Sequence, residues 1–152
     1  MTAIGARPIY LDYQATTPVD PRVVEAMLPY LTTEYGNPSS AHAYGRAAAA
    51  AVATARAQVA ALIGAREPDE IIFTSSGTES NHLALTGVAH AARAVGHGRH
   101  VITTTIEHPA TQATCDQLTA AGFQVTRLAV GDDGRLDPAD LERALQPDTV
   151  LV

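Results

Sequence analysis

Apolar runs of β character alternate with helix-compatible segments along the chain. The runs that predict strands lie at residues 71–74, 100–104, 123–130 and 149–152. The segments that predict helices lie at about residues 21–31, 40–63, 78–95, 109–121 and 138–146. Strands that alternate with helices are joined by right-handed crossover connections. The pattern therefore predicts an α/β fold, with a mostly parallel sheet flanked by helices.

Capping residues mark the ends of the predicted helices. Asp20 and Asp137 each stand directly before a proline, an order typical of a helix N-cap followed by the first helical residue. Gly64, Gly96 and Gly122 follow three of the helical segments. Glycine is the residue that most readily adopts the left-handed backbone at a helix C-terminus, so these three positions are expected to end their helices.

Length and composition bound the class of protein. The 152 residues, 46% of them hydrophobic, predict a single α/β domain over residues 1–152. A formal net charge of −6 argues against a nucleic-acid partner, which would need clustered basic residues. Residues 1–13 lack the charged start and apolar core of a signal peptide, and no apolar run reaches the ~20 residues needed to cross a bilayer. We therefore expect a cytoplasmic protein with no membrane-spanning segment.

The rarer side chains restrict the chemistry further. Cys115 is the only cysteine, which excludes an internal disulfide, and its position in a predicted helix indicates a buried, inert thiol. His97 and His100 have no carboxylate or cysteine close to them in the sequence, so we expect them in a solvated turn and predict no metal site. All ten basic residues are arginine, so the chain contains no lysine.

The junction between the predicted strand 71–74 and the next helix is the first candidate site. Ser76, Gly77 and Thr78 lie where backbone N–H groups and the helix dipole converge, which is a geometry that binds phosphate. Gly77 allows close approach to the backbone, and the two hydroxyls add donors. The segment matches neither the Walker pattern nor G-x-G-x-x-G. The same residue types also make an ordinary helix N-cap, so the segment alone leaves both interpretations open.

A second candidate follows the strand predicted at 100–104. Parallel strands end at the same edge of a sheet, so Glu107, His108 and Pro109 are expected beside the first candidate site. An imidazole that precedes a helix-opening proline suits a ring held flat against a ligand. His108 is therefore predicted to face the Ser76–Thr78 turn.

Four segments, in order, resemble the signature segments of cysteine desulfurases: "YLDYQATTPVDPRVVEAMLPYL", "YGNPSSAHAYGR", "IIFTSSGTESNHLAL" and "TTIEHPAT". These enzymes use pyridoxal 5'-phosphate (PLP) and belong to the class V aminotransferase, fold-type I group. The resemblance extends over essentially the whole chain and implies part of the large domain of that fold. It implies that Gly77 and Thr78 bind the cofactor phosphate, and that His108 stacks on the pyridine ring and assists proton transfer. It also implies that Ala15, Thr16, Thr17 and Asn37 line the site.

The resemblance further implies an incomplete active site. The family's covalent lysine, its pyridine-nitrogen aspartate, its substrate arginine and its sulfur-accepting cysteine fall beyond the position that matches Val152. We therefore expect residues 1–152 to be truncated before the catalytic lysine segment, and to be inactive alone because they contain no lysine. A missing C-terminal half or a second subunit would supply the rest.

The activity implied by the resemblance is the transfer of sulfur from L-cysteine, which yields L-alanine and an enzyme persulfide. It places the protein in sulfur metabolism and iron–sulfur cluster assembly, as a homodimer that meets a sulfur acceptor or scaffold protein. Two other functions remain open from the sequence. One is a non-catalytic truncated pseudoenzyme or interaction module, and the other is a related class V enzyme such as selenocysteine lyase.

Overall fold

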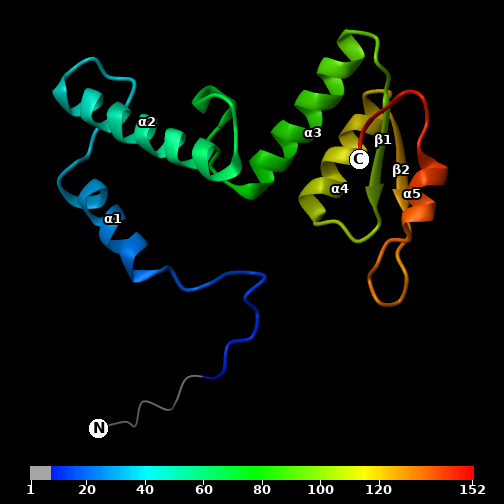
Figure 1. Ribbon diagram of the computed structural model, residues 1–152, viewed down its shortest axis with the longest axis horizontal. Helices are drawn as coiled ribbons and strands as arrows, with labels where there is room; N and C mark the ends of the chain where they lie inside the picture. Colours follow the sequence, from blue (N-terminus) through cyan, green and yellow to red (C-terminus); the bar gives the residue numbers. More distant parts are fainter. Residues whose placement is uncertain (1–7) are drawn as a thin grey trace. The chain divides into compact units, whose positions relative to one another are not determined.

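The computed structural model describes residues 8–152, which form two compact units (Figure 1). The first unit is Met1–Ile72 and the second is Phe73–Val152. Most of the segment in which we looked for a signal peptide lies outside the described residues. Within residues 8–152, every helix is too short or too polar to cross a bilayer.

The first unit contains α1 (Pro21–Thr32), α2 (Ala43–Ile63) and a short 3₁₀ helix, η1 (Pro68–Glu70). The side chain of Asp20 caps α1 by accepting a hydrogen bond from the Arg22 N–H at 2.8 Å. Gly64 ends α2 in the left-handed conformation, with φ 74°. Both caps confirm the boundaries predicted from the sequence, because capping depends on residues next to one another in the chain.

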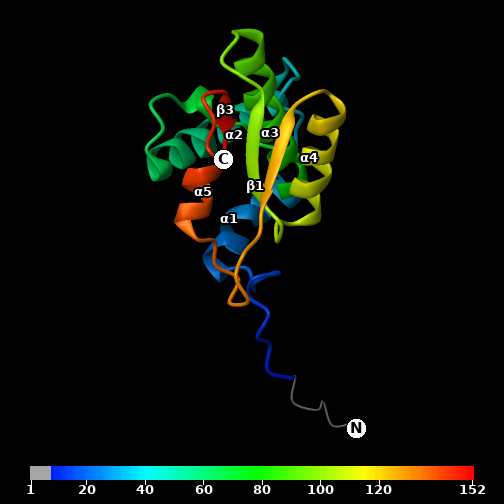
Figure 2. The same ribbon diagram turned by 90° about the vertical axis from the view of Figure 1, so that its right-hand side faces the viewer.

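The second unit is a three-stranded parallel sheet with helices on both faces (Figures 1 and 2). Its elements, in chain order, are α3 (Gly77–Ala94), β1 (His100–Thr104), α4 (Pro109–Ala120), β2 (Gln124–Leu128), α5 (Pro138–Ala144) and β3 (Thr149–Leu151). The strand order is β2-β1-β3, so β1 is the central strand. The predicted α/β class and the parallel direction of the strands are confirmed.

The strand predicted at residues 71–74 is wrong. Residues 71–74 carry no strand, and the boundary between the two units falls between Ile72 and Phe73. A strand exists only through ladder hydrogen bonds to a neighbour, and residues 71–74 pair with none of the strands in the described residues. The apolar pattern was strand-like, but a pattern does not supply a pairing partner.

The core of the second unit lies between the sheet and helices α3 and α4. Ala89 of α3, Val101 of β1, Leu118 of α4 and Phe123 form its buried cluster. Burial of these side chains fixes the two helices against the same face of the sheet, because the apolar area they remove from water is lost if either helix moves.

His100 lies in this sheet and not in a solvated turn, so that prediction is wrong. Its side chain is fully buried, and its Nδ1 and Nε2 atoms lie 2.7 Å from Thr149 Oγ1 and 2.8 Å from Thr126 Oγ1. The imidazole therefore links the central strand to both of its neighbours. Among residues 8–152, no group of three or more His, Cys, Asp or Glu side chains could hold a metal ion.

Replacing this imidazole should destabilise the sheet. His100→Leu leaves the Thr126 and Thr149 hydroxyls without their buried partner, and we expect it to lower the free energy of unfolding by about 1–3 kcal/mol. The double variant His100→Leu/Thr126→Val should recover part of that loss, because it removes one of the two hydroxyls that lose the imidazole. The other, that of Thr149, still accepts from the Gln146 N–H at 2.8 Å. Urea unfolding measures both variants. A double variant no more stable than His100→Leu would contradict the bridging role.

Candidate functional site

The turn before α3 is held by a reciprocal cap. Ser76 is the N-cap of α3, and its Oγ accepts a hydrogen bond from the Glu79 N–H at 3.2 Å. The Glu79 carboxylate in turn accepts from the Ser75 N–H at 2.7 Å and from the Ser75 hydroxyl at 2.6 Å. The Ser75 hydroxyl and N–H lower the pKa of the Glu79 carboxyl below its ordinary value. The contact is thus present at neutral pH and is lost only as pH falls through that lowered pKa.

Glu79 is a residue that the sequence analysis missed. A glutamate three residues after a serine N-cap is the signature of a capping box, so the signal was present in "SGTE". Its effect is to fix the shape of the turn that carries the candidate phosphate site.

The conformation and packing of this turn do not explain why residue 77 is a glycine. Its φ is not positive, and a Cβ built on it would meet nothing within 4 Å among the described residues. Neither the backbone conformation nor the packing of residues 8–152 therefore requires glycine here. The first N–H groups of a helix have no partner within the helix, so the Gly77 and Thr78 amides are of the kind that bind anions at helix starts.

The amino-terminal ends of α3 and α4 lie side by side. Asn81, in the second turn of α3, donates from Nδ2 to Thr111 Oγ1 in the first turn of α4 at 3.4 Å. His82, the next residue of α3, places its Nδ1 atom 3.4 Å from the Oγ1 atom of Thr114, which lies one turn further along α4. Helix packing, and not the strand expected at 71–74, therefore brings the starts of α3 and α4 together. That His108 faces the Ser76–Thr78 turn stays a prediction.

His108 stands at the start of α4, next to that pair of helix ends. It is the N-cap of α4, and its Nδ1 accepts a hydrogen bond from the Ala110 N–H at 3.1 Å. A backbone N–H can only donate, so Nδ1 carries no proton and the neutral ring is protonated at Nε2. The residue is exposed, which leaves its ring face and its Nε2–H accessible to a ligand.

Cys115 takes no part in this site. Its side chain is fully buried in α4, and burial raises the pKa of the thiol above its ordinary value. A protonated, inaccessible thiol is a poor nucleophile. The predicted burial of this cysteine is confirmed.

The predicted lining residues all belong to the first unit. The Ala15 and Thr16 N–H groups both donate to the Asp12 carbonyl, at 3.1 and 3.4 Å, and Thr17 follows this turn as an exposed residue. Asn37 accepts through Oδ1 from the Ser39 N–H at 2.9 Å and so shapes its own loop. These hydrogen bonds all lie within the first unit, and the role of the four residues in lining the site stays a prediction.

Comparisons with known proteins agree with these motifs. The aminotransferase class-V family model matches residues 9–152. Cysteine desulfurase from Homo sapiens is 56% identical over 147 residues, which are 96% of this chain and 32% of that protein. The cysteine desulfurase IscS of Anaeromyxobacter sp. (strain K) is 55% identical over 146 residues, 95% of this chain and 35% of that protein. The chain therefore spans about a third of the length of these relatives.

Solved structures give the same picture for the fold. A NifS-like protein superposes with a TM-score of 0.81 at 40% identity, covering 93% of this chain and 38% of that one. A structure described as SspA in complex with cysteine gives a TM-score of 0.78 at 38% identity, covering 92% of this chain and 40% of that one.

Substitution at Gly77 should separate an anion site from a simple helix cap. Gly77→Ala places a methyl group in the open space over the helix end, and we expect phosphate to bind roughly tenfold more weakly, a loss of about 1.4 kcal/mol. Gly87→Ala is the matched control, because it lies in the same helix and its Cβ position is equally open. Thermal denaturation with and without phosphate measures the effect.

The two variants should fold alike, since alanine favours a helix over glycine. The parent protein and Gly87→Ala should both be stabilised by phosphate, and Gly77→Ala should respond less. Equal phosphate-dependent shifts in all three proteins would rule out the anion site.

Proposed function

The chain belongs to the aminotransferase class-V family, and on that premise we propose that it is the amino-terminal, cofactor-binding part of a PLP-dependent cysteine desulfurase. The observation that carries the proposal is the pairing of two helix starts, α3 with its open amides and α4 with His108, through the Asn81–Thr111 contact. The relatives named cysteine desulfurase, at 56% and 55% identity, support the choice of activity within the family.

The first turn of α3 would hold the phosphate group of PLP. The Gly77 and Thr78 N–H groups and the Thr78 hydroxyl supply donors, and the helix dipole favours a negative charge at this point. The Ser76 hydroxyl is already engaged with the Glu79 N–H, so it would act mainly by shaping the turn. The open space at Gly77 is what lets a phosphate approach the backbone.

His108 would lie against the cofactor ring. PLP, when bound, supplies an electron sink for the substrate's bonding electrons. With Nδ1 occupied by the Ala110 N–H, the neutral imidazole can offer a ligand only the Nε2–H. Taking up a further proton at Nδ1 would require that cap to open. His108 is thus proposed as a ring-stacking residue and as a proton donor or carrier through these two nitrogens.

The covalent anchor of the cofactor must come from elsewhere. The chain contains no lysine, so a lysine outside these 152 residues, in a longer chain or in a second subunit, is part of the proposal. The same proposal includes the conversion of L-cysteine to L-alanine and the delivery of the sulfur to an acceptor or scaffold protein. It also includes homodimeric assembly and a cytoplasmic location. So does the membership of both units in one large domain.

Replacing His108 tests its role without disturbing the helix. His108→Asn removes the imidazole but keeps a side chain that caps helices well, so the fold should be retained. In the full-length protein, we expect a changed PLP absorption band and a fall in kcat of about 10²–10⁴-fold. His82→Ala, one helix away, should leave both nearly unchanged.

The measurements are visible absorption spectra and sulfide release from L-cysteine. An unchanged spectrum and an unchanged rate in His108→Asn would refute the role. If His108→Ala but not His108→Asn impaired the enzyme, the residue would be a helix cap only.

A further inference from the structure

The loop that carries His108 joins the end of β1 to the start of α4, and three hydrogen bonds fasten it. The Thr105 N–H donates to the Leu128 carbonyl at 2.9 Å, which continues the ladder one residue beyond the end of β1. The Thr104 hydroxyl donates to Glu107 Oε1 at 3.0 Å. The third bond comes from the side chain of Gln112, in the first turns of α4.

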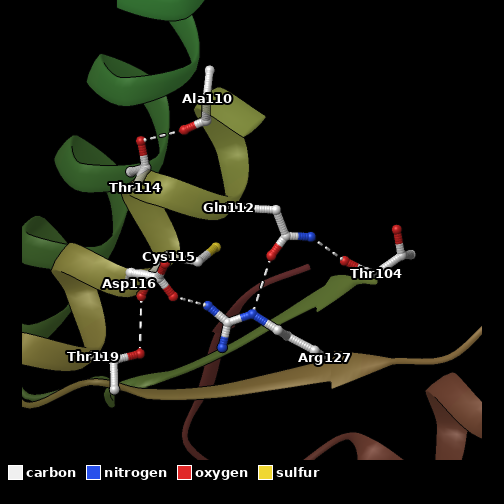
Figure 3. Close-up of polar contacts among 8 residues, drawn as sticks. All are labelled: Thr104, Ala110, Gln112, Thr114, Cys115, Asp116, Thr119 and Arg127. Atoms are coloured by element: carbon white, nitrogen blue, oxygen red, sulfur yellow. Dashed lines mark hydrogen bonds and ion pairs between the residues drawn. The ribbon is translucent and has the colours of Figure 1, made fainter. Parts of the chain in front are cut away.

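Gln112 bridges this loop to the neighbouring strand (Figure 3). Its Nε2 donates to the Thr104 carbonyl at 2.9 Å, and its Oε1 accepts from Arg127 Nε at 3.1 Å. Arg127 also reaches Asp116 of α4, with 2.6 Å between Nη2 and Oδ1. A chain of side chains therefore runs from the end of β1, through α4, to β2.

The orientation of the Gln112 amide is determined by its partners. The Thr104 carbonyl can only accept a hydrogen bond, and the Arg127 Nε–H can only donate one. A flipped amide would place Gln112 Oε1 against the Thr104 carbonyl oxygen, so that two acceptors face each other. It would also place Gln112 Nε2 against Arg127 Nε, so that two donors face each other. Gln112 therefore fits this position in one way, and a glutamate there would keep Arg127 but lose the bond to Thr104.

The Arg127–Asp116 ion pair contributes chiefly by orienting Arg127. The Asp116 side chain is 75% exposed and that of Arg127 is 32% exposed, and exposed ion pairs contribute little to stability. The contact between Gln112 and Thr104 is partly buried. The hydrogen bond from Gln112 to Thr104 spans the four residues Thr105–His108. Its loss would leave this segment, which sets the position of His108, with two of its three hydrogen bonds.

We propose that Gln112, oriented by Arg127, is a positioning residue for His108. It holds the end of β1 at a fixed distance from the first turns of α4, and so fixes where the imidazole stands relative to the first turn of α3. The inference rests on the proposed function, since it assigns Gln112 to the same cofactor site. Gln112 acts through His108 and touches neither cofactor nor substrate.

The experiment uses the full-length protein with Gln112→Glu, which keeps the contact with Arg127, and with Gln112→Met, which keeps only the approximate shape. Gln117→Glu, an exposed position on the same helix, is the matched control. Hydrogen exchange of residues 105–110, measured by mass spectrometry on the cofactor-free protein, reports the loop directly. We expect exchange roughly tenfold faster in both Gln112 variants and unchanged in the control.

Kinetics then distinguish positioning from general stability. Gln112→Glu should lower kcat about tenfold, with little change in KM for L-cysteine, and should shift the PLP band as His108→Asn does. In the His108→Asn background, the same substitution should have no further effect on kcat, because the residue that it positions is gone.

Three outcomes would overturn the inference. They are unchanged exchange in both Gln112 variants, faster exchange with unaltered kcat and spectrum, and an equal loss of kcat with and without the His108 imidazole. Failure of the proposed function is a different result. There, the wild-type protein would neither bind PLP nor release sulfide from L-cysteine, whatever the exchange rates of the variants.

Discussion

Parallel packing of α3 against α4 is the constraint on which the rest of the site depends. The amino-terminal turns of the two helices pack together through Asn81 and Thr111, and the proposed cofactor site combines the amides of one with the capping histidine of the other. An α-helix advances 5.4 Å per turn. A slip of one turn between these helices would therefore move their amino-terminal ends apart by more than the length of a hydrogen bond.

The sheet on which these helices pack is held by side-chain contacts at both ends of β1. At its start, His100 links the central strand to Thr126 of β2 and Thr149 of β3. At its end, Gln112 links the Thr104 carbonyl to Arg127 of β2. His100 is fully buried and serves the sheet, whereas Gln112 is only partly buried and lies beside the proposed site. Stability and positioning thus fall to different side chains of the same unit.

Features that depend on residues close together in the sequence were predicted correctly. Features that depend on contacts between distant residues were not. Asp20 and Gly64 cap helices through contacts within one or two turns, so their roles were readable directly. The strand at 71–74 was wrong because strand formation needs a partner that a local pattern does not reveal. His100 follows Gly96 and Gly98 in the sequence and was predicted to lie in a turn, although threonines 26 and 49 residues away hold it. Gln112 gave no signal, because its partners lie on two different strands.

This chain is proposed to supply the phosphate and ring contacts of a PLP site whose covalent lysine lies outside it. A crystal structure of the full-length protein with PLP bound tests this most directly. We predict phosphate oxygens within about 2.7–3.2 Å of the Gly77 and Thr78 nitrogens, the His108 ring against the cofactor, and the lysine beyond residue 152 or in a second subunit. A phosphate group bound away from the start of α3 would contradict the account.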